Sequence, residues 1–168
     1  MEIFFEVKNS TGVITLNRPK ALNALNLNMA IQLSKKLKEW EDDNAVERVI
    51  LLGEGNHFCA GGDVKSVHLS GPFSELKREF FSKEYSLNLQ IKNFPKPYLS
   101  IWKGVVMGGG VGLSIYGDYR IATDSTKFAM PETSIGFFPD VGGSFFLSRM
   151  ENNICLLYTS DAADERHC

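Results

Sequence analysis

Apolar and polar residues recur with a helical period in the first third of the chain. Between Asn28 and Asp43 the apolar residues fall on one face of a helix: Met29, Leu33, Leu37 and Trp40. Lysine and glutamate side chains occupy the opposite face. This pattern predicts an amphipathic helix, with Asn26 or Asn28 as its N-cap.

A second helical pattern extends from about Phe73 to Lys92. Its apolar stripe consists of five residues: Phe73, Leu76, Phe80, Leu87 and Ile91. Prolines at positions 95 and 97 end the helix, because a proline cannot continue it. Glu84 lies on this stripe, where a charge requires a partner or a function. A structural salt bridge and a functional carboxylate are both compatible with that position.

Short apolar, β-branched runs alternate with these helices. The expected strands are residues 12–16, 49–52, 98–102 and 119–122. A last helix is expected from about Asp140 to Met150. Because strands alternate with helices, the fold class is α/β, and because no repeat or linker interrupts the pattern, we expect one domain.

The composition excludes several classes of protein. Of the 168 residues, 43% are hydrophobic and 23% are charged, which is ordinary for a globular chain with one core. The net charge of -2 gives no reason to expect nucleic acid or a membrane as a partner, and no apolar run approaches the ~20 residues that span a bilayer. The spacing of Cys59, Cys155 and Cys168 suits neither a metal site nor a disulfide framework, and it favours a reduced intracellular protein.

Residues 155–168 differ in character from the rest of the chain. The stretch Cys155 to Ser160 (CLLYTS) is what translation of TGTCTCTTATACACATCT gives, and that string lies within the end sequence of a transposase-based sequencing library. We therefore predict that residues 155–168 are a non-native tail from adapter read-through, and that residues 1–154 form one incomplete domain. A natural polar C-terminus is the alternative.

Two glycine clusters follow predicted strands. The first is Ala60-Gly61-Gly62-Asp63, and the second is the run GGGVG from Gly108, which opens a helix. Glycine lets a ligand approach the backbone closely, and a helix N-terminus presents free N–H groups. Two such groups that converge on one point would form an oxyanion hole. Each cluster alone is better explained as a tight turn, and no Lys-Ser/Thr follows the glycines to make a phosphate loop.

Two carboxylic acids lie in apolar surroundings further along the chain. Glu132 follows Pro131 in FAMPET, and Asp140 lies in IGFFPDVGG. Carboxyl groups flanked by phenylalanine and isoleucine are candidates for a raised pKa and for acid–base catalysis. Asp140 could instead cap the helix that follows it, and Glu132 could cap a turn.

The order of these motifs resembles one family. NRPKALNAL, FCAGGD, MGGGVGLS and PETSIGFFPDVGG follow one another between about Thr11 and Met150, as in the crotonase, or enoyl-CoA hydratase/isomerase, superfamily. The combination is specific, although each glycine motif alone is not. The resemblance implies a crotonase-like spiral of ββα units, C-terminally truncated here, and a homo-oligomer for the full-length protein.

The resemblance also implies a site. The thioester carbonyl of an acyl-CoA substrate would lie between the backbone N–H groups of Gly62 and Gly109. Substrate binding through coenzyme A would involve Lys20, Ala21, Leu22, Ala60 and Gly61. No metal is implied, and no cofactor beyond the coenzyme A that is part of the substrate.

The positions of the acidic residues distinguish the reactions that members of this family catalyse. Hydratases of the family carry a catalytic Glu where this chain has Gly112, and dienoyl-CoA isomerases carry an Asp there. Gly112 with Glu132, Asp140 and the pair Glu84-Tyr85 resembles the 3-hydroxyisobutyryl-CoA hydrolase branch. The resemblance implies hydrolysis of a short hydroxyacyl-CoA thioester in valine catabolism. Glu132 would attack the carbonyl or activate water, Asp140 would position the substrate hydroxyl and assist proton transfer, and Glu84 would contact the substrate.

Two other functions stay open. One is an enoyl-CoA hydratase or isomerase with rearranged acids, which Gly112 argues against. The other is an inactive acyl-CoA-binding fragment, because the helices that close the family's site and build its oligomer follow the stretch seen here. The enzymes that the chain resembles are mitochondrial, so the matrix is the expected location, although the first ten residues match neither a signal peptide nor an Arg-rich transit peptide.

Overall fold

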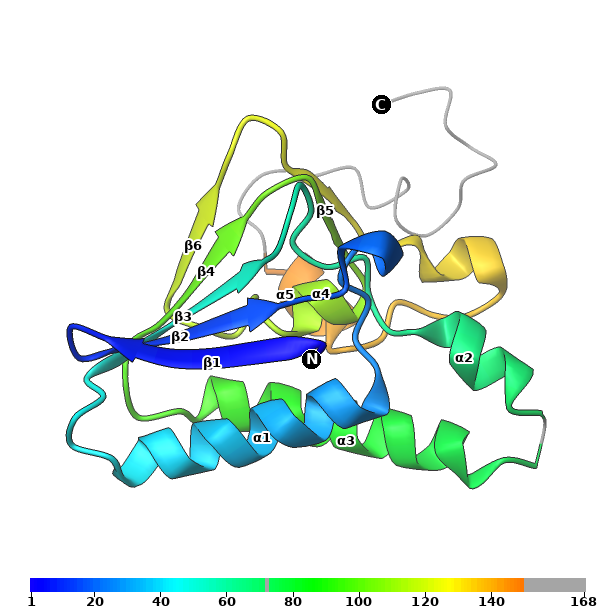
Figure 1. Ribbon diagram of the computed structural model, residues 1–168. Helices are drawn as coiled ribbons and strands as arrows, with labels where there is room; N and C mark the ends of the chain where they lie inside the picture. Colours follow the sequence, from blue (N-terminus) through cyan, green and yellow to red (C-terminus); the bar gives the residue numbers. More distant parts are fainter. Residues whose placement is uncertain (72, 150–168) are drawn as a thin grey trace.

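The computed structural model describes residues 1–71 and 73–149 of the chain. The predicted tail, residues 155–168, lies outside the described residues. A five-stranded sheet forms the centre of the described part, with the order β1 (Ile3–Lys8), β2 (Thr11–Leu16), β3 (Arg48–Gly53), β4 (Tyr98–Trp102) and β6 (Tyr119–Ala122) (Figure 1). The β1–β2 pair is antiparallel, and the remaining pairs of this sheet are parallel.

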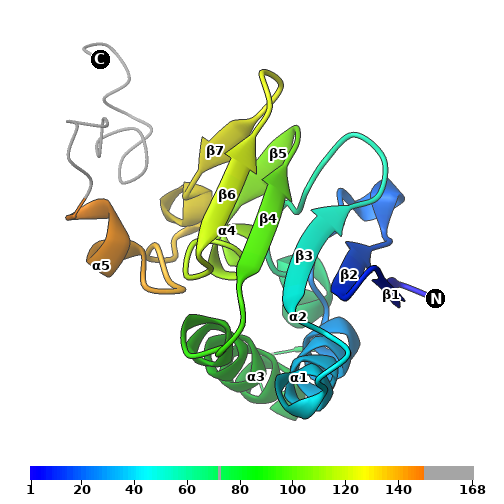
Figure 2. The ribbon, with the colours of Figure 1, turned by 90° about the vertical axis from the view of Figure 1, so that its left-hand side faces the viewer.

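A second, smaller sheet stands beside the β4–β6 edge of the first (Figure 2). Its two parallel strands are β5 (Val105–Met107) and β7 (Lys127–Ala129). The chain enters β5 almost directly from β4, so the first glycine of the GGG run follows β5 at once. Strand β5 therefore delivers Gly108 and Gly109 to the interior of the molecule, where both are buried.

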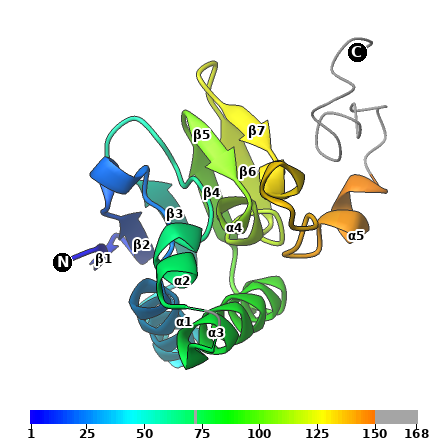
Figure 3. The same ribbon diagram turned by 90° about the vertical axis from the view of Figure 1, so that its right-hand side faces the viewer.

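Two long helices lie side by side across one face of the large sheet (Figures 1 and 2). They are α1 (Leu27–Asp42) and α3 (Glu75–Lys92), and a hydrogen bond of 2.7 Å between Ser34 and Gln90 joins them. The remaining helical segments are short: η1 (Pro19–Ala21), α2 (Val64–Leu69), α4 (Gly109–Gly112), η2 (Pro131–Ile135) and α5 (Gly143–Leu147). In Figure 3, α2 and α4 both lie above the two long helices.

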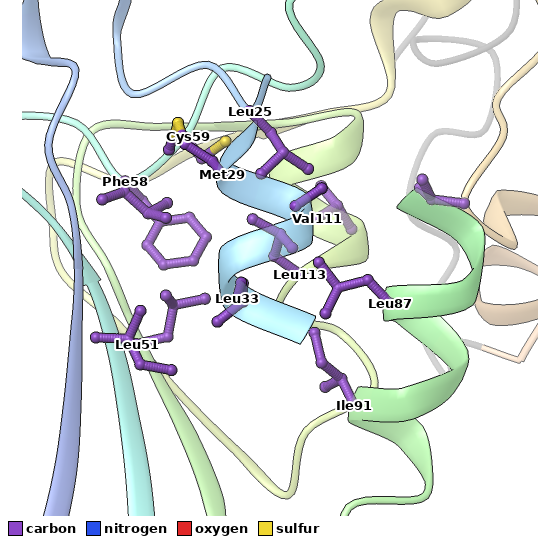
Figure 4. Close-up of a cluster of buried hydrophobic side chains, with 14 of the residues drawn as sticks. Leu25, Met29, Leu33, Leu51, Phe58, Cys59, Leu87, Ile91, Val111 and Leu113 are labelled. Carbon is purple, nitrogen blue, oxygen red and sulfur yellow. The ribbon is translucent and has the colours of Figure 1, made fainter. Parts of the chain in front are cut away.

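The apolar core fills the space between the sheet and the two long helices (Figure 4). Helix α1 contributes Met29 and Leu33, and α3 contributes Leu87 and Ile91, all of them at most 2% exposed. All four residues of α4 are buried inside this core. The glycine-rich segment is thus held by packing on every side, which gives its backbone one fixed direction.

The periodic patterns predicted the main elements well. The four expected strands are present within one residue at each end, and α1 begins after Asn26, whose side chain accepts a hydrogen bond from Met29 N–H at 2.9 Å. That bond identifies Asn26, rather than Asn28, as the N-cap. Strands β1, β5 and β7 and helix α2 were not predicted from the sequence.

Two helix boundaries were predicted wrongly. Phe73 lies before α3 and is 97% exposed, because Ser74 caps the helix by accepting a hydrogen bond from Leu76 N–H. The last helix begins at Gly143 rather than Asp140, because Val141 and Gly142 have positive φ angles of 44° and 79° that no helix accommodates. The residue before α5 is Gly142, so the prediction that Asp140 caps this helix is wrong.

Candidate active site

The two glycine clusters, which are far apart in the sequence, meet in the structure. A Cβ atom placed on Gly109 would lie 3.0 Å from the amide nitrogen of Gly62 and 2.1 Å from Oε1 of Glu84. One on Gly62 would lie 2.9 Å from the ring of Phe80. A side chain at Gly109 would enter the space between the two backbone segments, and one at Gly62 would press on Phe80.

The N–H groups of Gly62 and Gly109 are free donors. Leu25 binds the loop on both sides of Gly62, through Gly61 C=O at 2.8 Å and Asp63 N–H at 2.7 Å, but leaves the Gly62 N–H unused. Gly109 is the first residue of α4, so its N–H precedes the first bond of the helix. In the described part of the chain, no acceptor is hydrogen-bonded to either N–H group. Two adjacent, fixed and unused donors can stabilise a negatively charged oxygen.

A cavity of about 470 Å³ opens in front of these amides. It is lined by Gly61, Gly62, Gly108 and Gly109 and by three carboxylic acids, Glu84, Glu132 and Asp140. Phe80, Phe81 and Phe137 form much of its apolar wall. Such a cleft, apolar with a few convergent polar groups, is the usual form of a small-molecule site.

The segments predicted to bind coenzyme A are also neighbours. Ala60 N–H donates to the carbonyl of Leu22 at 3.0 Å, which joins the residues just after η1 to the first glycine loop. Ala60 and Gly61 line the cavity, whereas Lys20, Ala21 and Leu22 are not part of its wall. Leu22 is in the left-handed region, with φ of 50°.

Each of the three acids comes from a different element. Glu84 projects from α3, Glu132 lies in η2, and Asp140 lies in the loop before α5; they are 2%, 8% and 8% exposed. Within residues 1–71 and 73–149 no Lys, Arg or His forms a salt bridge with Glu84, so the salt-bridge interpretation of Glu84 is wrong there. Oε1 of Glu84 and Oε2 of Glu132 are buried and have no hydrogen-bond partner among the described residues.

Burial raises the pKa of all three acids, and charge repulsion adds to the rise for Glu84 and Glu132. Burial, with the nearby charges of Asp140 and Glu132, raises the pKa of Glu84 to about 8. Burial and Asp140 raise the pKa of Glu132 to about 7. Burial also raises the pKa of Asp140, although a hydrogen bond of 2.8 Å from the Tyr85 hydroxyl opposes this. Glu84 therefore keeps its proton at neutral pH, and Glu132 titrates near neutrality.

Gly112 is closely surrounded. A Cβ atom there would lie 2.9 Å from both amide atoms of Asn88 and from Cβ of Val141. Asn88 is 6% exposed, and its amide has no hydrogen-bond partner in the described residues. The space that an acidic side chain at position 112 would need is therefore already filled.

Sequence reasoning missed Tyr85 and Asn88 as parts of the site. Tyr85 contacts Asp140 across 55 residues of sequence, a pairing that no local pattern indicates. Asn88 was detectable in principle, because it stands four residues after Glu84 and so shares its helix face. Among the described residues, no group of three or more His, Cys, Asp or Glu could hold a metal ion, and no helix has the length and hydropathy for crossing a membrane.

Residues 11–161 match the family described as Enoyl-CoA hydratase/isomerase. The chain belongs to this family. It is 50% identical over 157 residues to "3-hydroxyisobutyryl-CoA hydrolase, mitochondrial" of Danio rerio, which covers 92% of this chain and 41% of that relative. The protein of the same name from Homo sapiens is 48% identical over 155 residues, covering 91% and 40%.

A solved structure shares the fold. The carnitinyl-CoA dehydratase of Mycobacterium thermoresistibile is 46% identical, with a TM-score of 0.86 over 90% of this chain and 45% of that one. The family and the α/β crotonase-type fold predicted from the motif order are thereby confirmed. The chain spans about 40% of the length of the curated relatives it matches.

Proposed function

We propose that the protein hydrolyses the thioester of a short 3-hydroxyacyl-CoA, with 3-hydroxyisobutyryl-CoA as substrate. The observation that carries this proposal is the pair of free amides at Gly62 and Gly109, with Glu132 on the wall of the same cavity. The names of the relatives from Danio rerio and Homo sapiens support the choice of acyl group.

The amides act on the thioester carbonyl. As a nucleophile adds to the carbonyl carbon, negative charge develops on its oxygen, and the N–H groups of Gly62 and Gly109 stabilise it. Removing one such donor from an oxyanion hole typically costs about 10²- to 10³-fold in rate. An ionised Glu84 would repel this oxygen, because it lies directly against Gly109. Its raised pKa keeps Glu84 neutral, so that the site holds a net attraction for the oxyanion.

Glu132 carries out the attack. Either its carboxylate adds to the carbonyl carbon, with release of the coenzyme A thiol and later hydrolysis of the acyl-enzyme, or it removes a proton from the attacking water. A pKa of about 7 gives Glu132 a usable fraction of carboxylate at neutral pH and more basicity than an ordinary Glu. Asp140, on the same cavity wall, holds the substrate hydroxyl and assists proton transfer.

An enoyl-CoA hydratase or dehydratase is the second candidate. The name of the structure from Mycobacterium thermoresistibile favours it. Addition of water across a double bond in this family relies on a second acid at the position of Gly112, and here Asn88 and Val141 fill that space. We therefore place hydrolysis first.

The test compares two substrates. The protein, produced from its complete gene, is incubated with 3-hydroxyisobutyryl-CoA and with crotonyl-CoA while free thiol and enoyl absorbance are followed. We expect thiol release from the first and little change in the second. Glu132→Gln should abolish thiol release, whereas Glu79→Gln, on the exposed side of α3, should not. Hydration of crotonyl-CoA without thiol release would refute the hydrolase assignment.

We further propose that the protein works in valine catabolism in the mitochondrial matrix, as a homo-oligomer with no nucleic acid or membrane partner. The word mitochondrial in the names of the relatives supports the compartment. Fractionation of cells that express the complete gene with a C-terminal tag tests it, and a cytosolic signal would contradict it. Light scattering of the same protein tests the oligomer.

A further inference from the structure

Tyr85 is hydrogen-bonded to Asp140, one of the three acids that line the cavity in front of the glycine amides (the glycine cavity). Its hydroxyl donates a hydrogen bond of 2.8 Å to Oδ2 of Asp140. Tyr85 follows Glu84 on α3, so consecutive residues of one helix supply one acid of the site and hold another. No other described side chain is hydrogen-bonded to the Asp140 carboxylate.

Both partners of this bond are fixed before any substrate binds. The Tyr85 ring packs on Phe81, with ring centroids 5.9 Å apart, and Phe81 stacks on Phe137. On the other side, the Tyr116 hydroxyl donates to the carbonyl of Val141 at 2.7 Å. Val141 has φ of 44°, a conformation that a β-branched residue adopts only when its surroundings impose it. The loop that carries Asp140 is thus held in a strained but definite position.

Asp140 stands between two cavities. It lines the 470 Å³ cavity with the glycine amides and also a second, more apolar cavity of about 680 Å³. Tyr85 lines the second of these cavities but not the first. The Tyr85 hydroxyl therefore binds Oδ2 of Asp140 from a residue that does not line the glycine cavity.

We propose that Tyr85 is a positioning residue, whose hydroxyl orients the Asp140 carboxylate toward the glycine cavity and stabilises its charge. This inference rests on the proposed thioester hydrolysis for its catalytic consequence, but the hydrogen bond itself does not. A carboxylate that keeps one oxygen bound to Tyr85 presents the other to the substrate hydroxyl in a single orientation.

The groups around Asp140 determine whether removal of the Tyr85 hydroxyl raises or lowers the pKa of Asp140. Glu84 on α3 and Glu132 in η2 line the same cavity as Asp140, and burial is what raises the pKa of Asp140. Lys92 of α3 lines the second cavity, where its Nζ lies 5.0 Å from the Phe145 ring centroid, and forms no salt bridge with Asp140 in the described residues. The Tyr85 hydrogen bond is therefore the side-chain contact that lowers the pKa of Asp140, and its removal raises that pKa.

The test is an NMR titration of ¹³C-carboxyl-labelled aspartate in the protein and in Tyr85→Phe. The Asp140 signal is assigned by its loss in Asp140→Asn. We expect Tyr85→Phe to raise the pKa of Asp140 by about one unit, because the hydrogen bond from the hydroxyl favours the charged carboxylate. We also expect kcat for the hydroxyacyl thioester to fall about tenfold, with less change in KM.

The control is Tyr98→Phe, which likewise removes a hydrogen-bonded tyrosine hydroxyl, one that donates to Leu113 C=O at 3.2 Å. It should lower the melting temperature and leave the pKa of Asp140 unchanged. An unchanged Asp140 titration in Tyr85→Phe would overturn the proposal, and a shifted one supports it even if no thioester is hydrolysed. Should Tyr85→Phe fail to fold, Asp140→Asn provides the reciprocal measurement, because loss of the Asp140 charge should lower the pKa of Tyr85.

Discussion

Gly109→Ala is the substitution that separates catalysis from stability most clearly. The added Cβ would lie 2.1 Å from Oε1 of Glu84 and 3.0 Å from the amide nitrogen of Gly62. It would therefore enter the space where the substrate oxygen has to lie between the two amides. We expect kcat/KM to fall by about 10²- to 10³-fold, the cost of losing an oxyanion-hole donor.

The effect of Gly109→Ala on stability should be small by comparison. Gly109 is in α4, where alanine is a better helix former than glycine, and its φ is not among the positive values. The clash falls on the end of the Glu84 side chain, whose Oε1 forms no hydrogen bond within the part of the chain that the structure describes. Relief by movement of that carboxyl should cost about 1 kcal/mol, or about 2–4 °C in melting temperature.

The assay is thiol release from 3-hydroxyisobutyryl-CoA together with thermal unfolding. Gly117→Ala is the matched control, because its Cβ would meet Tyr98 at 2.6 Å, away from the cavity. It should lower stability and leave kcat/KM of the folded protein close to that of the unmodified protein. If Gly109→Ala keeps kcat/KM within about threefold, the amide of Gly109 does not stabilise the reacting oxygen and the reasoning is wrong.

Four further predictions address the acids, Gly112 and the tail. Folding raises the pKa of Glu84, so the contribution of the Glu84 carboxyl to stability is present below its unfolded pKa and is lost as pH rises to about 8. Glu84→Gln should therefore stabilise the protein at pH 8 by on the order of 3 kcal/mol and by much less at pH 5, as measured by melting curves at the two pH values. For hydrolysis, kcat/KM should rise with pH up to about 7 as Glu132 ionises, and a flat profile there would exclude it as base or nucleophile. Gly112→Glu should destabilise the fold by about 2 kcal/mol and give no crotonyl-CoA hydration, because Asn88 and Val141 occupy the space. Sequencing genomic DNA across the codons for residues 153–165 should show a break near residue 155, and continuity would identify a natural C-terminus.

The periodic parts of the fold were predictable from the sequence, and the short parts were not. Helix α1 was predicted from the helical spacing of its apolar residues, and strand β3 from an uninterrupted apolar run. Strands β5 and β7 have three residues each, too few to show a period, and they are fixed by pairing with each other. The start of α5 was misplaced because Val141 adopts a left-handed backbone that its residue type disfavours.

The candidate site likewise has parts that could be predicted from the sequence and parts that could not. The order of the glycine motifs and the acids predicted that Gly62, Gly109, Glu132 and Asp140 belong together, and all four line one cavity. The free state of the two amides could not be predicted, because it depends on which acceptors the fold brings near them. The contact between Tyr85 and Asp140 likewise arises only from the packing of α3 against a distant loop.

The central claim is that a thioester carbonyl lies between the amides of Gly62 and Gly109. Isotope-edited infrared spectroscopy of a ¹³C-carbonyl-labelled acyl-CoA, bound to a Glu132→Gln protein that does not turn it over, measures this directly. Two hydrogen bonds should polarise the carbonyl and move its stretching band to lower frequency than in water, and Gly109→Ala in the same background should reverse the shift. A bound carbonyl with an unshifted band in Glu132→Gln would contradict the account.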